Sequence, residues 1–173
     1  MNVLDIVKQF IHALLIYLIQ VLVFRTTTLW DAAACFIYLG FLIQLPFYLP
    51  KITILVITFC FTFAIDIFFN TPGVHTSAAL IIMYFRPSII KLLSPQGGYE
   101  SQDSINIFNM GIQWHTLYAF IMIFIHTTLV FIIESIGSFH LGTSLLKIIG
   151  TTLFTLIVVM LYQFLFLYRR NTR

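Results

Sequence analysis

Six apolar runs, separated by short polar links, constrain the fold of this chain more than any other feature. About 20 helical residues cross the apolar core of a bilayer, which is about 30 Å thick, and each run approaches that length. Charged residues make up 9% of the chain and hydrophobic ones 60%, whereas about 25% of a soluble domain is charged. We therefore expect one integral membrane domain over residues 1–173, with spans at 6–24, 32–49, 52–69, 72–93, 111–136 and 143–168.

The spans are predicted to be helices, because the short alternating runs that mark membrane barrels do not occur in the sequence. Residues 94–110 form the one long polar link, SPQGGYESQDSINIFNM, whose Pro, Gly, Ser and Asp content predicts irregular structure. The fold class is therefore an all-α bundle of six transmembrane helices. Its cations lie at the ends of apolar runs and form no continuous stripe, so we expect no binding to nucleic acid.

The distribution of Lys and Arg predicts the orientation, because loops on the cytoplasmic side carry an excess of both. Six spans place the N-terminus, the link 94–110 and the C-terminus on one side of the membrane. Two cations fall on the opposite side, Arg25 and Lys147, and seven fall on the first: Lys8, Lys51, Arg86, Lys91, Arg169, Arg170 and Arg173. Both termini are therefore predicted to be cytoplasmic.

The stretch DIFFNTPGVHTSAALIIMYFRP, residues 66–87, carries two charges in apolar surroundings. Asp66 precedes the NTPG turn by about 6 Å along its helix, and Arg86 follows that turn by about 21 Å along the next one. Their depths differ by about 15 Å, so we expect no salt bridge between them.

Asp66 lies just inside the predicted outer surface, near the start of the fourth span. Asn70 shares its helical face, Thr71 is a good N-cap, and Pro72 suits the first helical position. A carboxylate near a helix N-terminus is electrostatically favoured. We interpret Asp66 as a tie between the third span and the fourth, with ion or substrate binding as the other possibility.

Arg86 lies near the predicted cytoplasmic boundary, where its guanidinium could reach the lipid headgroups. The other interpretation is a specific contact to a partner or to a cytoplasmic loop. Pro87 lacks a backbone donor and restricts the residue before it, so the helix is expected to kink or end there.

Histidines supply most of the other polar groups within the spans. His115 and His126 share a helical face with Tyr118 and Met122, but they lie about 16 Å apart along the axis, too far to bind one metal ion. Hydrogen bonding between helices is the favoured interpretation, and a proton relay is the alternative. His12 and Gln20 are predicted to line the bundle interior in the same way.

Lys147 is expected at the same outer depth as two carboxylates, and we predict that it pairs with Glu134 or with Asp66. Small residues, among them Gly150, could permit close helix contacts. No nucleophile motif, phosphate loop or metal-ligand spacing is present in the sequence. The residues therefore predict a protein that is not an enzyme and has no cofactor.

The block DIFFNTPGVHTSAALIIMYFRPSIIKLLSP, residues 66–95, resembles the MreD family of bacterial rod shape-determining membrane proteins. In this block an Asp ends one span, a Gly turn follows, and Arg-Pro precedes a Lys-bearing end. The resemblance continues through GGYE, GIQWHTLYAFIMIFIH and TLFTL, and length and span number fit nearly the whole chain.

The resemblance implies a non-enzymatic scaffold or regulator of lateral peptidoglycan synthesis in the bacterial inner membrane. Its implied partners are a bitopic MreC-like protein and, more widely, MreB and a RodA-like polymerase with its transpeptidase. Members of the family are also similar to the six-helix substrate-binding subunits of energy-coupling vitamin transporters, so a small-molecule-binding transporter subunit is the alternative. Structural or partner-contact candidates are Asp66, Asn70, Pro72, Gly73, His75, Arg86, Pro87, Glu134 and Lys147.

Overall fold

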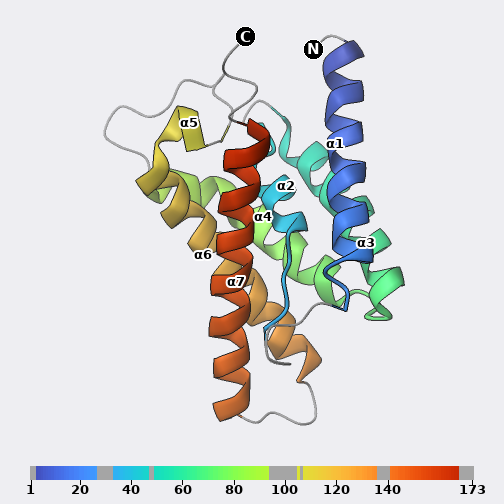
Figure 1. The fold of residues 1–173 in the computed structure, drawn as a ribbon, viewed down its shortest axis with the longest axis vertical. Coiled ribbons are helices and arrows are strands. Elements are labelled where there is room, and N and C mark those ends of the chain that lie inside the picture. Colours follow the sequence, from blue (N-terminus) through green and yellow to red (C-terminus); the bar gives the residue numbers. More distant parts are fainter. Residues whose placement is uncertain are drawn as a thin grey trace.

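The structure, a computed structural model, describes residues 3–26, 33–46, 49–93, 105, 107–135 and 141–167. The described residues form helices joined by turns (Figure 1). In chain order these are α1 (Val3–Leu22), α2 (Tyr38–Ile43), α3 (Lys51–Phe69), α4 (Val74–Leu93), α5 (Ile107–Met110), α6 (Ile112–Glu134) and α7 (Leu141–Leu167).

Four of these helices are long and apolar enough to cross a membrane: α3, α4, α6 and the part of α7 from Ser144 to Leu165. The apolar stretch of α1, Gln9–Leu22, is shorter. Large apolar side chains face outward, and Ile52, Leu92 and Leu146 are 76%, 80% and 72% exposed. Lipid can cover such a surface but water cannot, so the composition of the helices and their outer faces together indicate a membrane protein.

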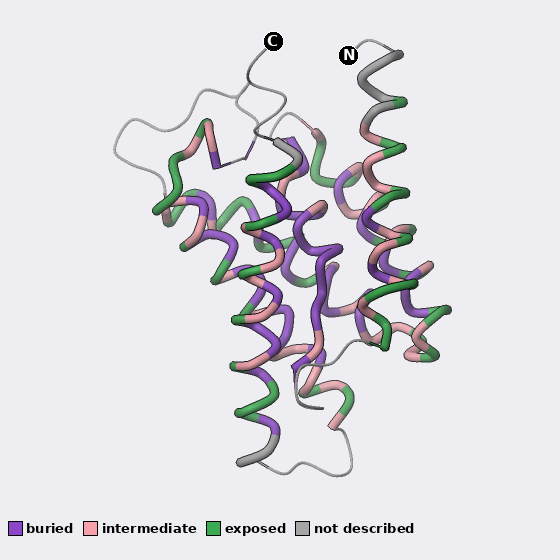
Figure 2. The backbone as a smooth tube through the Cα atoms, in the orientation of Figure 1, coloured by how far each residue is buried: buried purple, intermediate pink, exposed green. Residues whose placement is uncertain are grey.

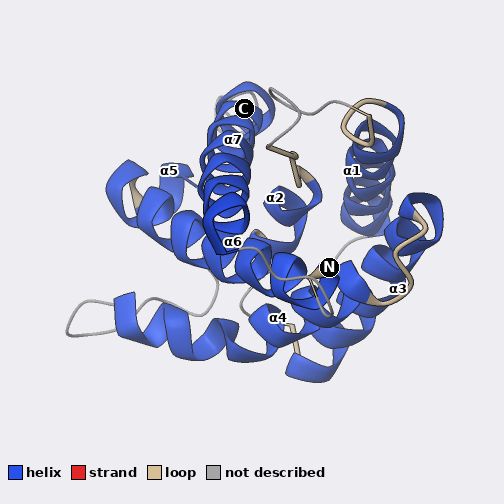
Figure 3. Ribbon diagram, turned by 90° about the horizontal axis from the view of Figure 1, so that it is seen from below, coloured by secondary structure: helices blue, strands red, loops and turns tan. Residues whose placement is uncertain are grey.

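The long helices pack around α2, which contacts α1, α6 and α7. Seen from below, α2 lies between α1 and α7 (Figure 3). Buried residues gather along α2 and on the inner sides of its neighbours, whereas exposed residues lie on the outer sides (Figure 2). The beginning of α1 and the end of α7 lie at the same end of the molecule (Figure 1).

The second apolar run differs most from the sequence prediction. Instead of a helix over 32–49, the described part contains a non-helical segment, residues 33–37, followed by the six-residue α2. In Figure 1 the segment runs nearly straight toward α2. Four residues near full extension, 33–36, and seven in helical conformation, 37–43, cover about 24 Å, so this run covers a long path with few residues.

Side chains of α1 and α7 satisfy the backbone of segment 33–37, which makes the non-helical path possible. Thr151 and Thr155 accept hydrogen bonds through Oγ1 from the backbone N–H groups of Ala34, at 3.1 Å, and Phe36, at 3.0 Å. Gln20 donates to the carbonyl of Cys35 at 3.0 Å. Irregular backbone at membrane depth is tolerated only where protein satisfies its polar groups. The partners are far away in the sequence, so the run itself did not predict this path.

Close contact between segment 33–37 and α7 depends on small side chains. A Cβ added at Gly150 would lie 3.1 Å from the Cβ of Ala33. The prediction that Gly150 permits close packing is therefore confirmed, although its neighbour is the segment and not a helix.

Replacing Thr155 by Val tests the role of these hydroxyl groups. The change keeps the shape of the side chain but leaves the buried N–H of Phe36 without its acceptor. A buried unsatisfied donor costs roughly 1–3 kcal/mol, so we expect the free energy of unfolding in detergent or bicelles to fall by about that much. Thr128→Val is the matched control, because Thr128 donates only within its own helix, to the carbonyl of Phe124. Equal stability of the two variants would contradict this assignment.

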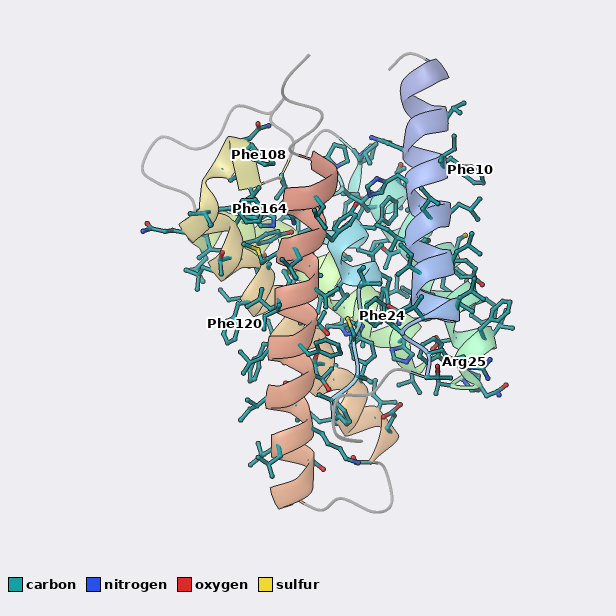
Figure 4. All side chains as sticks on the ribbon, viewed as in Figure 1. Phe10, Phe24, Arg25, Phe108, Phe120 and Phe164 are labelled. Carbon is teal, nitrogen blue, oxygen red and sulfur yellow. The ribbon has the colours of Figure 1, made fainter. Side chains whose placement is uncertain are left out.

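The ends of the other runs also differ from the predictions in places. Helix α4 begins at Val74 instead of Pro72 and ends at Leu93, as the predicted span does. Of the two expectations for Pro87, a kink or a helix end, the end is wrong, because the helix continues through it. The link 94–110 was predicted to be irregular, but its residues 107–110 form α5. Residues 94–104 and residue 106 lie outside the described part of the chain. Phe108 of α5 packs on Phe164 of α7 with ring centroids 6.3 Å apart (Figure 4).

Candidate functional site

Asp66, one turn before the end of α3, binds the beginning of α4 with both carboxylate oxygens. Oδ1 accepts from the backbone N–H of His75 at 3.1 Å and from the hydroxyl of Thr71 at 3.1 Å. Oδ2 accepts from the backbone N–H of Thr76 at 2.9 Å and from its hydroxyl at 2.5 Å. Asp66 is 1% exposed. The predicted tie between the third and fourth spans is confirmed.

The sequence predicted Thr71 as the N-cap of α4. In the structure Asp66 of α3 caps this helix instead. The backbone reverses between the helices through Asn70, whose φ is 55°, and Gly73, whose φ is +84°. Both values lie in the left-handed region, which Gly and Asn adopt most readily. The turn brings the first amide groups of α4 over Asp66, where a negative charge also interacts favourably with the helix dipole. Asn70 and Pro72 are exposed on this turn.

His75 begins a second set of contacts deeper in the bundle. The hydroxyl of Tyr38, in α2, lies 3.2 Å from Nδ1 of His75 and 2.9 Å from Nε2 of His126 in α6. The two imidazole rings are nearly parallel, with centroids 6.3 Å apart. Because a hydroxyl group can donate one hydrogen bond and accept others, one tyrosine holds both rings. The group fastens α2, α4 and α6 together.

Arg86 points into the protein and not toward the lipid headgroups. It is 3% exposed, and its Nε donates to the hydroxyl of Tyr118 at 3.0 Å. Its Nη2 donates to the carbonyl of Ile43, the last residue of α2, and to the carbonyl of Leu45, two residues later. The hydroxyl of Tyr118 also donates to the Ile43 carbonyl, at 3.1 Å. The interpretation of Arg86 as an anchor at the membrane surface is therefore wrong.

A positive charge at the end of α2 is favourable, because the last carbonyls of a helix carry partial negative charge. Arg86 supplies several donors in a fixed plane, which suits carbonyls that point in different directions. As their different depths predicted, Arg86 and Asp66 bind different parts of the protein: Asp66 binds the beginning of α4, and Arg86 binds Tyr118 and the end of α2.

The other predicted interior residues also connect helices. Gln20 is fully buried and binds the second run at Cys35 and Tyr38. His12, which is half-buried, is hydrogen-bonded to the Tyr162 hydroxyl of α7. The amide of Gln163 donates to Nε2 of His115 at 2.5 Å. These contacts confirm that polar groups inside the bundle join one element to another.

The predicted ion pair of Lys147 is not present among the described residues. Glu134 and Lys147 are both exposed and near enough for their charges to interact, but no salt bridge joins them. Asp66 already has four donors from the turn and α4. Long side chains at a surface gain little from pairing, because water or headgroups solvate each charge well.

The structure thus has two polar centres, one around Asp66 and His75 and one around Arg86. The side chains of His75 and Arg86 bind the second run directly, and Asp66 acts on it through α4. Sequence reasoning identified Asp66, His75 and Arg86 but missed their partners Tyr38, Thr76 and Ile43. The stripe of His115, Tyr118, Met122 and His126 on the fifth span also located buried polar partners, and all four residues are fully buried.

The described residues contain no cluster of three or more His, Cys, Asp or Glu side chains that could hold a metal ion. Open grooves lie between helices of the described part, and two of them are lined mainly by apolar residues. One, of about 440 Å³, is lined by Ile112, Gln113, Thr116, Leu117, Phe120 and Leu156. The other, of about 260 Å³, is lined by Ile81, Ile82, Phe85, Ser88, Ile89, Leu92 and Ile125. Phe120 points outward from the first groove (Figure 4).

No protein-family model, curated protein or solved structure matches the chain.

Proposed function

We propose that this protein is a membrane scaffold of the bacterial cell-elongation complex, similar in role to the MreD family. In addition to the resemblance of residues 66–95, one structural observation supports the proposal. The middle of the bundle, where a transported molecule would bind, is filled by the protein's own second run. Between Cys35 and Ile43 every side chain except the half-buried Phe41 is buried.

The buried polar groups support the same function. A transporter subunit would direct such groups into a cavity, whereas those of Asp66, Tyr38 and Arg86 bind other parts of the chain. A rigid bundle with apolar outer faces suits a protein that works by holding membrane partners. The filled interior weighs against the alternative of a vitamin-binding transporter subunit.

The proposal includes an orientation with both termini in the cytoplasm. The beginning of α1 and the end of α7 lie at one end of the molecule, and Arg25 lies toward the other (Figure 4). Lys51 begins α3, and Lys91 lies in the last turn of α4. A reporter that is active only in the cytoplasm, fused after Arg173, is expected to be active. Activity of a periplasmic reporter at the same position would contradict the orientation.

Depletion in a rod-shaped bacterial host tests the function. We expect depleted cells to become round within a few generations, because lateral wall synthesis loses its scaffold. The MreC-like protein of that host is expected to co-purify with the full chain. A variant with Thr128→Val, which changes one contact within a helix, serves as the complementing control. Rod-shaped cells after depletion, together with no association with the MreC-like protein, would reject the proposal.

A further inference from the structure

The groove of about 260 Å³ lies on the outer side of α4, beside Ile125 of α6. Its lining is apolar except for Ser88, and three of its residues are strongly exposed: Ile81 by 40%, Phe85 by 54% and Leu92 by 80%. The volume is below the roughly 300–1,000 Å³ that is typical of pockets for drug-sized ligands. A groove of this size accommodates a single flexible chain.

The groove follows α4 over three helical turns. From Ile81 to Leu92 it covers eleven residues, or about 16 Å of helix axis. The end of the groove near Leu92 lies at the membrane boundary, because the indole of Trp114 donates there to the carbonyl of Leu93 at 2.9 Å. Tryptophan is enriched at this level of a membrane.

Two lysines, neither of which lines the groove, lie close to residues that do. Lys91, next to Leu92, is exposed near the boundary end. Lys51, at the start of α3, is held over the ring of Tyr84, with Nζ 3.3 Å from the ring centroid. Tyr84, Ser88 and Lys91 recur at i, i+4 and i+7 and therefore share one side of α4. An apolar groove that contains one hydroxyl group thus has two exposed cations close to its lining.

We propose that this groove binds an anionic phospholipid from the leaflet on the side of the chain termini. One acyl chain lies along Ile81 and Phe85, on the side of Ser88 that is away from the membrane boundary. The phosphate receives a hydrogen bond from Ser88 and the charge of Lys91, with Lys51 as a second cation nearby. We favour a lipid over a partner helix, because the two exposed lysines near the groove complement the charge of a phosphate group.

Native mass spectrometry of the full chain in a mild detergent tests the proposal. Dioleoyl phosphatidylglycerol and dioleoyl phosphatidylcholine, which differ only in the headgroup, are added separately at equal concentration. We expect one phosphatidylglycerol molecule to be retained roughly tenfold more than phosphatidylcholine, because each lysine near the surface attracts an anionic lipid. The double variant Lys51→Gln/Lys91→Gln is expected to retain both lipids equally.

Lys147→Gln is the matched control, because Lys147 is also exposed but lies at the opposite end of the bundle. It should retain lipids as the wild type does. Ser88→Trp fills the groove and is expected to reduce retention of both lipids. Equal retention of the two lipids by the wild type, or an equal loss in Lys147→Gln and the double variant, would overturn the proposal. Full retention by Ser88→Trp would also overturn it.

Discussion

Replacing Arg86 by Met is expected to lower the free energy of unfolding by roughly 3–5 kcal/mol, the cost of leaving a buried charged network without one partner. Methionine keeps much of the apolar length of the side chain, so the loss reports on the guanidinium. Without it, the carbonyl of Leu45 and the hydroxyl of Tyr118 lose a donor inside the protein. Helix α2 also loses the cation at its end.

Unfolding in bicelles, or the temperature at which the protein aggregates in detergent, measures this effect. Lys91→Met is the matched control, since it removes a cation from the same helix at an exposed position. Arg86→Lys should lie between the wild type and Arg86→Met, because an ammonium group cannot bond several carbonyls with the geometry of a guanidinium. If Arg86→Met is as stable as Lys91→Met, Arg86 does not hold α2.

The sequence was informative wherever the interaction is local or the solvent decides the structure. Apolar runs of span length predicted α3, α4, α6 and α7, because a bilayer selects for length and hydrophobicity alone. Asp66 could also be interpreted correctly. Its partners Thr71, His75 and Thr76 follow within ten residues, on a turn marked by Pro and Gly.

The sequence was less informative where distant segments determine the conformation. The second run is as apolar as the others, but Gln20, Thr151 and Thr155 provide hydrogen bonds that replace those of a helix. The same holds for Arg86. Its position near a predicted boundary suggested the headgroups, whereas the unpaired carbonyls at the end of α2 exist only because that run is not one long helix. The non-helical path of the second run, which was not predicted, thus explains both the missing helix over 32–49 and the buried position of Arg86.

Pro87 shows how tertiary contacts can keep a helix going past a proline. Proline removes one hydrogen bond within a helix and was expected to kink or end it, but α4 continues to Leu93. Pro87 is on the exposed side of the helix, and its neighbour Arg86 is fixed by bonds to α2 and α6. These contacts hold α4 against the bundle at the residue before the proline.

Replacing Asp66 by Asn is expected to destabilise the protein by about 3 kcal/mol or more, because hydrogen bonds to a charged group contribute roughly 1.5–3 kcal/mol each. The carboxylate accepts from four donors. An amide of the same shape keeps one acceptor oxygen and turns an N–H₂ group toward groups that are themselves donors. The first turn of α4 should then separate from α3 before the rest of the bundle unfolds.

Hydrogen exchange distinguishes this local effect from general instability. In the Asp66→Asn variant the amides of His75 and Thr76 should exchange much faster, whereas those in the middle of α6 stay protected. Glu134→Gln is the matched control: it removes the charge of an exposed carboxylate near the same end of the bundle and should leave both regions unchanged. Because His75 also binds Tyr38, opening of this turn should next expose α2. Protection of His75 and Thr76 equal to that of the wild type would show that Asp66 does not join the two helices.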